Sequence, residues 1–185
     1  MNTKELPKIK GFLKVYKVLL YLSLIIMAPA ILLYFLDIQV LNLDPQQMNA
    51  EGIADLAEIM SMPEIIEDQS AFPTSGFATL MGFYKAKTNW LIFSSAYGIF
   101  SSITAIILLN KRSRKLPIAA IVLAGIGTLL DRINSFILLD EYKLITQVSD
   151  YISENLLISG FEIIINTAII LYLFTSKNAK ETLIN

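Results

Sequence analysis

The 185-residue sequence contains neither cysteine nor histidine. These absences exclude disulfide bonds, thiolate metal sites, cysteine nucleophiles and every histidine-based acid–base catalyst. A glycine-rich phosphate loop and a nucleophile elbow are missing as well. We therefore expect a protein that is not an enzyme and that holds neither a metal nor a cofactor.

Charge is also scarce: 17% of the residues are charged and 55% are hydrophobic. Soluble domains carry about a quarter charged residues. Four apolar runs are each long enough to cross a hydrocarbon core of about 30 Å, and backbone in lipid must satisfy its own hydrogen bonds. The sequence predicts one all-α polytopic membrane domain over residues 1–185, an up–down bundle of four transmembrane helices. The runs cover residues 15–36, 90–109, 117–139 and 156–174.

Lys and Arg gather in three places: the N-terminal tail, the connection 110–116 and the C-terminal tail. Together these segments hold eleven of the fifteen basic residues. The positive-inside rule then places both termini and the connection 110–116 in the cytoplasm. The long loop 37–89 and the connection between the third and fourth runs lie outside.

The first run could be mistaken for a cleaved signal peptide, because Ala28-Pro29-Ala30 resembles a small-residue cleavage motif. The apolar run continues past that motif to Leu36. This continuation favours an uncleaved signal anchor, with a kink at Pro29.

The outer loop 37–89 is too long to be a simple connector. Asp44-Pro45 is typical of a helix start, and apolar residues of the segment 53–60 recur at helical spacing. We expect an amphipathic helix that ends near Pro63. It acts either as a lid on the outer mouth of the bundle or as a docking surface for a partner. Residues 77–84 are expected to be helical and to lean on the membrane surface.

Small residues recur at every fourth position in the second and third runs, a spacing that lets helices approach closely. We expect them to pack these two spans against each other. A dimer seam or a flexible point in the third span is the alternative. The residues are Ser94, Gly98 and Ser102 in the second run, and Ala120, Ala124, Gly125, Gly127 and Thr128 in the third.

Three charged residues lie deep within the apolar runs, away from the ends of the runs: Asp131, Arg132 and Glu162. Counted at 1.5 Å per residue, both acids lie about 9 Å below the outer edge of the membrane. Charges in lipid usually pair with each other or face a cavity. We expect a buried polar layer in which Arg132 pairs with one of the acids, completed by Asn134, Asn166 and Ser94.

Two interpretations of this polar layer remain open. The layer could be an ion-pair clasp that fixes the register of the helices. It could instead be an ion, proton or solute site that opens outward, since two acids and one arginine leave a carboxylate without a partner. Arg132 could also extend outward and pair with Asp140.

Both ends of the sequence are similar to a known family. Lys10-Gly11-Phe12-Leu13 resembles the Gly-Gly-Trp-Leu start of a bacterial four-helix inner-membrane family, which is known only as a domain of unknown function. The segment 171–183 resembles the Tyr-Phe-x-x-Ser-x-Arg-Val-Lys-x-Thr-Phe tail of that family, with Asn178-Ala179 in place of Arg-Val and Leu183 in place of Phe. The resemblance implies a protein of the bacterial inner membrane, and it implies no activity.

The absence of catalytic motifs and the elaborated outer loop favour a non-enzymatic accessory or assembly subunit of a membrane complex. The alternative is a small oligomeric transporter or channel component that uses Asp131 and Glu162. An intramembrane enzyme ranks third. The expected partners are the lipid bilayer and a larger membrane protein or further copies of the chain, and not nucleic acid.

Overall fold

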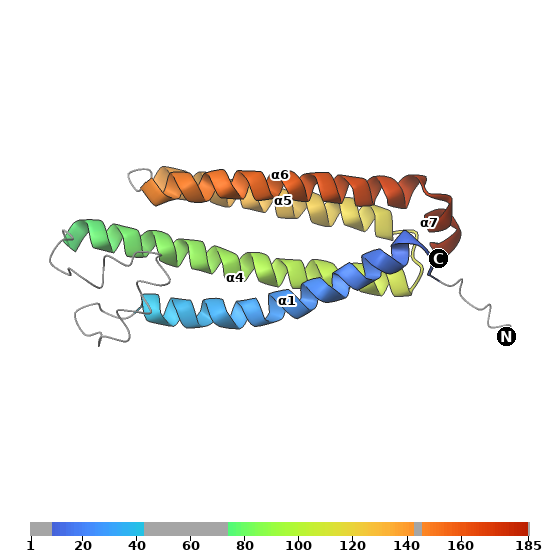
Figure 1. The fold of residues 1–185 in the computed structure, drawn as a ribbon, viewed down its shortest axis with the longest axis horizontal. Coiled ribbons are helices and arrows are strands. Elements are labelled where there is room, and N and C mark those ends of the chain that lie inside the picture. Colours follow the sequence, from blue (N-terminus) through green and yellow to red (C-terminus); the bar gives the residue numbers. More distant parts are fainter. Residues whose placement is uncertain (1–8, 43–73, 143–145, 185) are drawn as a thin grey trace.

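The structure, a computed structural model, describes residues 9–42, 74–142 and 146–184. All the secondary-structure elements in these residues are helices. Four long helices run alongside one another, and a fifth short helix lies across one end (Figure 1). The helices are α1 (Phe12–Leu41), α4 (Thr74–Asn110), α5 (Leu116–Glu141), α6 (Thr146–Thr175) and α7 (Lys177–Thr182).

The four long helices have the length and composition of membrane spans, which the structure places at Phe12–Leu41, Met81–Asn110, Leu116–Glu141 and Tyr151–Thr175. Their outer faces carry large apolar side chains; Ile25, for example, is 68% exposed and Phe136 is 77% exposed. A soluble protein rarely exposes apolar surface so continuously. The chain is therefore a multi-pass, all-α membrane protein, and the predicted fold class is confirmed.

The helices are longer than the apolar runs from which they were predicted. Residues 77–84 belong to α4, so the prediction that they are helical is confirmed, and they continue directly into the second span. Their contact with the membrane surface stays a prediction. Phe83 is only 1% exposed, and Met81, Tyr84 and Thr88 are also buried. Contacts with the rest of the protein stabilise this first part of α4, and hydropathy does not report such contacts. The amphipathic helix predicted to end near Pro63 lies outside the described residues.

Helix α1 continues through Pro29 to Leu41 and bends along its length (Figure 1). Proline lacks an N–H group and its ring crowds the preceding turn, so a bend is the usual consequence of proline inside a helix. The bend keeps α1 beside α4, and the two helices pack along each other.

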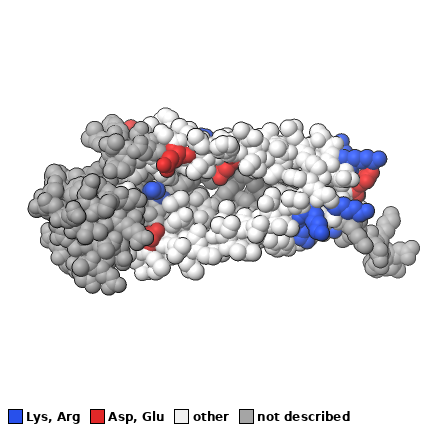
Figure 2. Space-filling view, in the orientation of Figure 1, with Lys and Arg blue, Asp and Glu red and all other residues white. Residues whose placement is uncertain are grey.

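The bundle consists of two helix pairs, α1 with α4 and α5 with α6; α4 also contacts α5. At one end the pairs are joined by an apolar group that we call the basic-end cluster, because Lys and Arg gather at that end (Figure 2). Lys17 there donates a hydrogen bond of 2.7 Å to Asn110, which links α1 to α4. The cluster comprises Leu13, Tyr16, Ala105, Leu109, Leu116, Leu173, Ala179 and Leu183.

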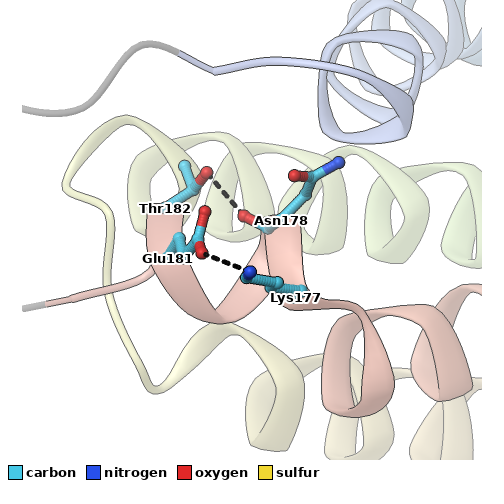
Figure 3. Close-up of polar contacts among 4 residues, drawn as sticks. All are labelled: Lys177, Asn178, Glu181 and Thr182. Carbon is cyan, nitrogen blue, oxygen red and sulfur yellow. Dashed lines mark hydrogen bonds and ion pairs between the residues drawn. The ribbon is translucent and has the colours of Figure 1, made fainter.

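The basic end also brings together the two segments that carry the family resemblance. Gly11, at the start of α1, has φ 58°, and only glycine adopts this conformation without strain. The ring of Phe12 lies 4.7 Å from that of Tyr172. Helix α7 closes this end, where Thr182 donates a hydrogen bond to the Asn178 carbonyl and Lys177 lies 3.9 Å from Glu181 (Figure 3).

At the opposite end an aromatic cluster joins α4 to α6. The ring of Phe83 lies 5.3 Å from that of Tyr84, 5.7 Å from that of Tyr142 and 6.0 Å from that of Tyr151. Burial, with a further contribution from the Glu141 carboxylate, raises the pKa of the Tyr142 phenol, which keeps this hydroxyl neutral. The two helix pairs are thus joined at both ends of the bundle.

Candidate functional site

Between the two joined ends, the helix pairs separate around a cavity of about 560 Å³. On α4 its lining extends from Trp90 to Ala105, which corresponds to about 22 Å along the helix axis. The hydrocarbon core of a bilayer is about 30 Å thick. Figure 2 shows a hollow between the helix pairs, with acidic atoms beside it. The cavity therefore extends through much of the membrane.

One face of α6 supplies a polar stripe to this cavity. Its members are separated by four, four, three and four residues, a spacing that places them on one side of a helix. Glu162 and Asn166 were predicted from the sequence as members of a polar layer, whereas the other three members were not. The complete stripe is Tyr151, Asn155, Ser159, Glu162 and Asn166, and all five line the cavity.

Asp131 extends from α5 into the same cavity and is held by this stripe. Its Oδ2 accepts a hydrogen bond of 2.7 Å from the Ser159 hydroxyl. Its Oδ1 lies 3.5 Å from the side-chain nitrogen of Asn155. That nitrogen also lies 3.5 Å from the Tyr151 hydroxyl. Both oxygens of Asp131 thus face hydrogen-bond donors of the stripe.

Glu162 lines the cavity too, but its environment differs from that of Asp131. Within the described part of the chain, its carboxylate accepts no hydrogen bond and forms no ion pair. Glu162 as a whole is exposed in the isolated chain. The two acids that were expected at the same depth therefore face one cavity, one held by donors and the other open to a ligand.

Arg132 and Asn134 take other positions. Neither belongs to the cavity lining, and among the described residues no ion pair joins Arg132 to Asp131 or Glu162. Adjacent residues on a helix point about 100° apart, so the acid and the arginine face different directions. The side-chain nitrogen of Asn134 is buried and has no hydrogen-bond partner among the described residues.

The small residues of α4 contact α1. A Cβ atom built on Gly98 would lie 2.5 Å from the Met27 sulfur. Ser102 lies 2.7 Å from the Ser23 hydroxyl. Because Ser23 donates its single hydrogen to the Leu20 carbonyl, Ser102 is the donor between the two serines. Gly98 and Ser102 thus pack against α1 within the first helix pair. Both residues also line the cavity.

On α5 the two glycines have different surroundings. A Cβ atom on Gly127 would lie 3.1 Å from the ring of Tyr97, whereas one on Gly125 would meet nothing within 4 Å. The Tyr97 hydroxyl donates a 2.6 Å hydrogen bond to the Leu123 carbonyl, so this ring is fixed against α5. Ser94, Ala120, Ala124 and Thr128 line the cavity beside it. The small side chains provide space for the cavity.

Comparison of the chain with protein-family models, with curated proteins and with solved structures finds no match. Any proposal of function therefore rests on the chemistry of the cavity. Its described lining contains two carboxylates and no Lys or Arg. A cation outside the lining lies close by, since the Lys87 ammonium is 5.0 Å from the centroid of the Tyr151 ring.

Proposed function

We propose that the protein is the solute-binding component of a small membrane transporter, with the basic end in the cytoplasm of a bacterial cell. The observation that carries this proposal is the cavity of about 560 Å³ between the helix pairs, with its polar stripe and its two carboxylates. An ion-pair clasp needs Arg132 beside an acid, and the geometry does not favour it. The transporter alternative is therefore favoured over the accessory subunit that the sequence suggested first.

The energetic argument concerns polar groups in lipid. Inserting a single Asp at the centre of a membrane helix costs about 2.5–3.5 kcal/mol on insertion scales. A bundle that only packs against a partner has no need to direct Asp131, Glu162 and the four amide or hydroxyl side chains of the stripe at one empty space. A solute site uses these groups, because they bind the solute when it enters.

A second copy of the chain is the expected partner. Helices α1 and α6 border the cavity from different pairs, and their aromatic contact, between Phe12 and Tyr172, is at the basic end. Four helices enclose a pathway poorly, so we propose that the chain acts as a homo-oligomer. The resemblance to the bacterial inner-membrane family supports only the bacterial membrane in this proposal.

Accessibility of introduced cysteines tests whether water reaches the cavity. The chain contains no cysteine, so each single variant carries one thiol. In proteoliposomes, Ser94→Cys and Asn166→Cys should react with a charged, membrane-impermeant methanethiosulfonate at least about tenfold faster than Ile126→Cys, because the reactive thiolate forms only in contact with water. Ile126 is 44% exposed on α5 and lies outside the cavity lining, so it serves as the control.

The opposite result would favour the accessory subunit. If both cavity cysteines react as slowly as the control from either side of the membrane, the space between the pairs is dry. A larger membrane protein should then co-purify in stoichiometric amount after mild detergent extraction. If the cavity cysteines react and the chain purifies alone or as a homo-oligomer, the transporter proposal stands.

A further inference from the structure

We infer that the solute of this cavity is an amphiphilic organic cation, such as a hydrophobic ammonium or phosphonium compound. The inference rests on the proposed function and names its substrate class. Four observations support it: the charge of the lining, the volume of the cavity, the aromatic residues and the side opening.

The charge of the lining selects a cation. Asp131 and Glu162 contribute two carboxylates, and the described lining residues include no Lys or Arg. Asp131 has Ser159 and Asn155 as donors, whereas Glu162 has none among the described residues. An ionised carboxylate without a partner is costly in a medium of low dielectric constant. A bound cation removes this cost, and an anion increases it.

The volume of the cavity selects an organic molecule. Pockets that bind small organic ligands measure about 300–1,000 Å³, and this cavity of about 560 Å³ falls within that range. A bare metal ion needs a compact group of oxygen ligands around it. The described residues contain no group of three acidic side chains that could hold such an ion.

Aromatic rings line the same cavity. Trp90 and Phe93 lie with their ring centroids 5.3 Å apart, and Tyr97 and Tyr151 add two further rings to the lining. The face of an aromatic ring attracts organic cations. Lys87 illustrates this attraction, because its ammonium lies 5.0 Å from the centroid of Tyr151. Carboxylates combined with aromatic rings match a cation that carries apolar groups.

The opening of the cavity selects an amphiphilic ligand. The lining includes apolar residues that are also exposed on the membrane-facing surface: Leu19 of α1, and Ile158 and Ile165 of α6. The hollow is visible from the side of the bundle in Figure 2. A molecule dissolved in the membrane reaches Glu162 between α1 and α6 without crossing either end of the bundle.

Two ions of the same shape and opposite charge test the inference. We expect the purified full-length protein in detergent to bind tetraphenylphosphonium saturably in a calorimetric titration, and tetraphenylborate at least tenfold more weakly. Glu162→Gln should weaken phosphonium binding at least tenfold, and Glu162→Asp should keep it within a few-fold of the wild type. Asp140→Asn serves as the matched control, because Asp140 is an exposed carboxylate of α5 outside the cavity lining.

A lysine variant tests the sign of the charge independently of Glu162. Lys87→Gln removes the ammonium that lies 5.0 Å from the Tyr151 ring and 5.5 Å from the Tyr84 ring. It should tighten phosphonium binding several-fold, because like charges repel each other strongly in a poorly screened site. Weaker phosphonium binding by a Lys87→Gln protein with the wild-type melting temperature would contradict a cationic ligand.

The remaining outcomes separate this inference from the function on which it rests. Equal binding of phosphonium and borate, or wild-type affinity in Glu162→Gln, overturns the substrate class. If the Ser94→Cys thiol reacts with the impermeant reagent while phosphonium does not bind, the transporter proposal stands and the organic cation is wrong. If the thiol is unreactive and phosphonium does not bind, both proposals fail.

Discussion

Leu109→Ala should lower the free energy of unfolding by about 2–5 kcal/mol, the usual cost of truncating a fully buried leucine. Leu109 is 0% exposed and lies in the last turn of α4. Its cluster includes Leu13 from the first helix pair and Leu116 and Leu173 from the second. The lost methyl groups therefore weaken the junction that holds the two pairs together at the basic end.

The control for this prediction is Ile107→Ala on the same helix. Ile107 is 47% exposed on the membrane-facing surface, where lipid replaces the missing side chain, so we expect a loss below about 1 kcal/mol. Reversible unfolding in mixed detergent micelles measures the free energy of unfolding of both variants. Equal losses for the two substitutions would show that the basic-end cluster does not join the pairs.

Gly127→Leu should destabilise the bundle by about 1–3 kcal/mol, as overpacking of a filled site does. A Cβ atom at this position would already lie 3.1 Å from the ring of Tyr97. That ring cannot rotate away freely, because the Tyr97 hydroxyl is bound to the Leu123 carbonyl at 2.6 Å. The leucine must therefore separate α4 from α5 or break this hydrogen bond.

Gly125→Leu, two residues earlier on the same helix, should instead stabilise the bundle. A Cβ atom there meets nothing within 4 Å, and replacing a helical glycine recovers up to about 1 kcal/mol of helix propensity. The thermal midpoints of unfolding, measured in detergent, compare the stabilities of the two variants. A Gly127→Leu protein as stable as Gly125→Leu would mean that α4 and α5 do not meet at Tyr97.

The sequence was sufficient to predict the number and approximate position of the spans, because uninterrupted apolar runs of about 20 residues are typical of membrane helices and rare in soluble domains. Their full length was not predictable in the same way. Lys85 and Lys87 interrupt the hydropathy of α4, yet the helix includes them and begins at Thr74. Its early turns are stabilised by burial of Phe83 against aromatic residues that are distant in sequence.

The candidate site, too, was predictable from the sequence only in part. Counting residues predicted a similar depth in the membrane for Asp131 and Glu162, since each residue adds a fixed rise along a helix. Depth does not determine direction, so the sequence could not separate Asp131, which lines the cavity, from Arg132, which does not. The spacing of Asn155 and Ser159 before Glu162 was a readable signal, but part of it lies outside the apolar run on which the prediction relied.

The hydrogen bond from Tyr97 also affects the mechanics of α5. In a regular helix the Leu123 carbonyl already accepts a bond from the residue four positions later, which is Gly127, and here it accepts a second from Tyr97. The Leu123 carbonyl is thus shared by two donors, and Gly125 and Gly127 follow it. We expect this to be the most easily bent part of α5, because glycine resists helix bending least. The basic-end and aromatic clusters hold both ends of the bundle. The middle of α5 can then bend while its two ends stay fixed. This bending widens or narrows the cavity beside the helix.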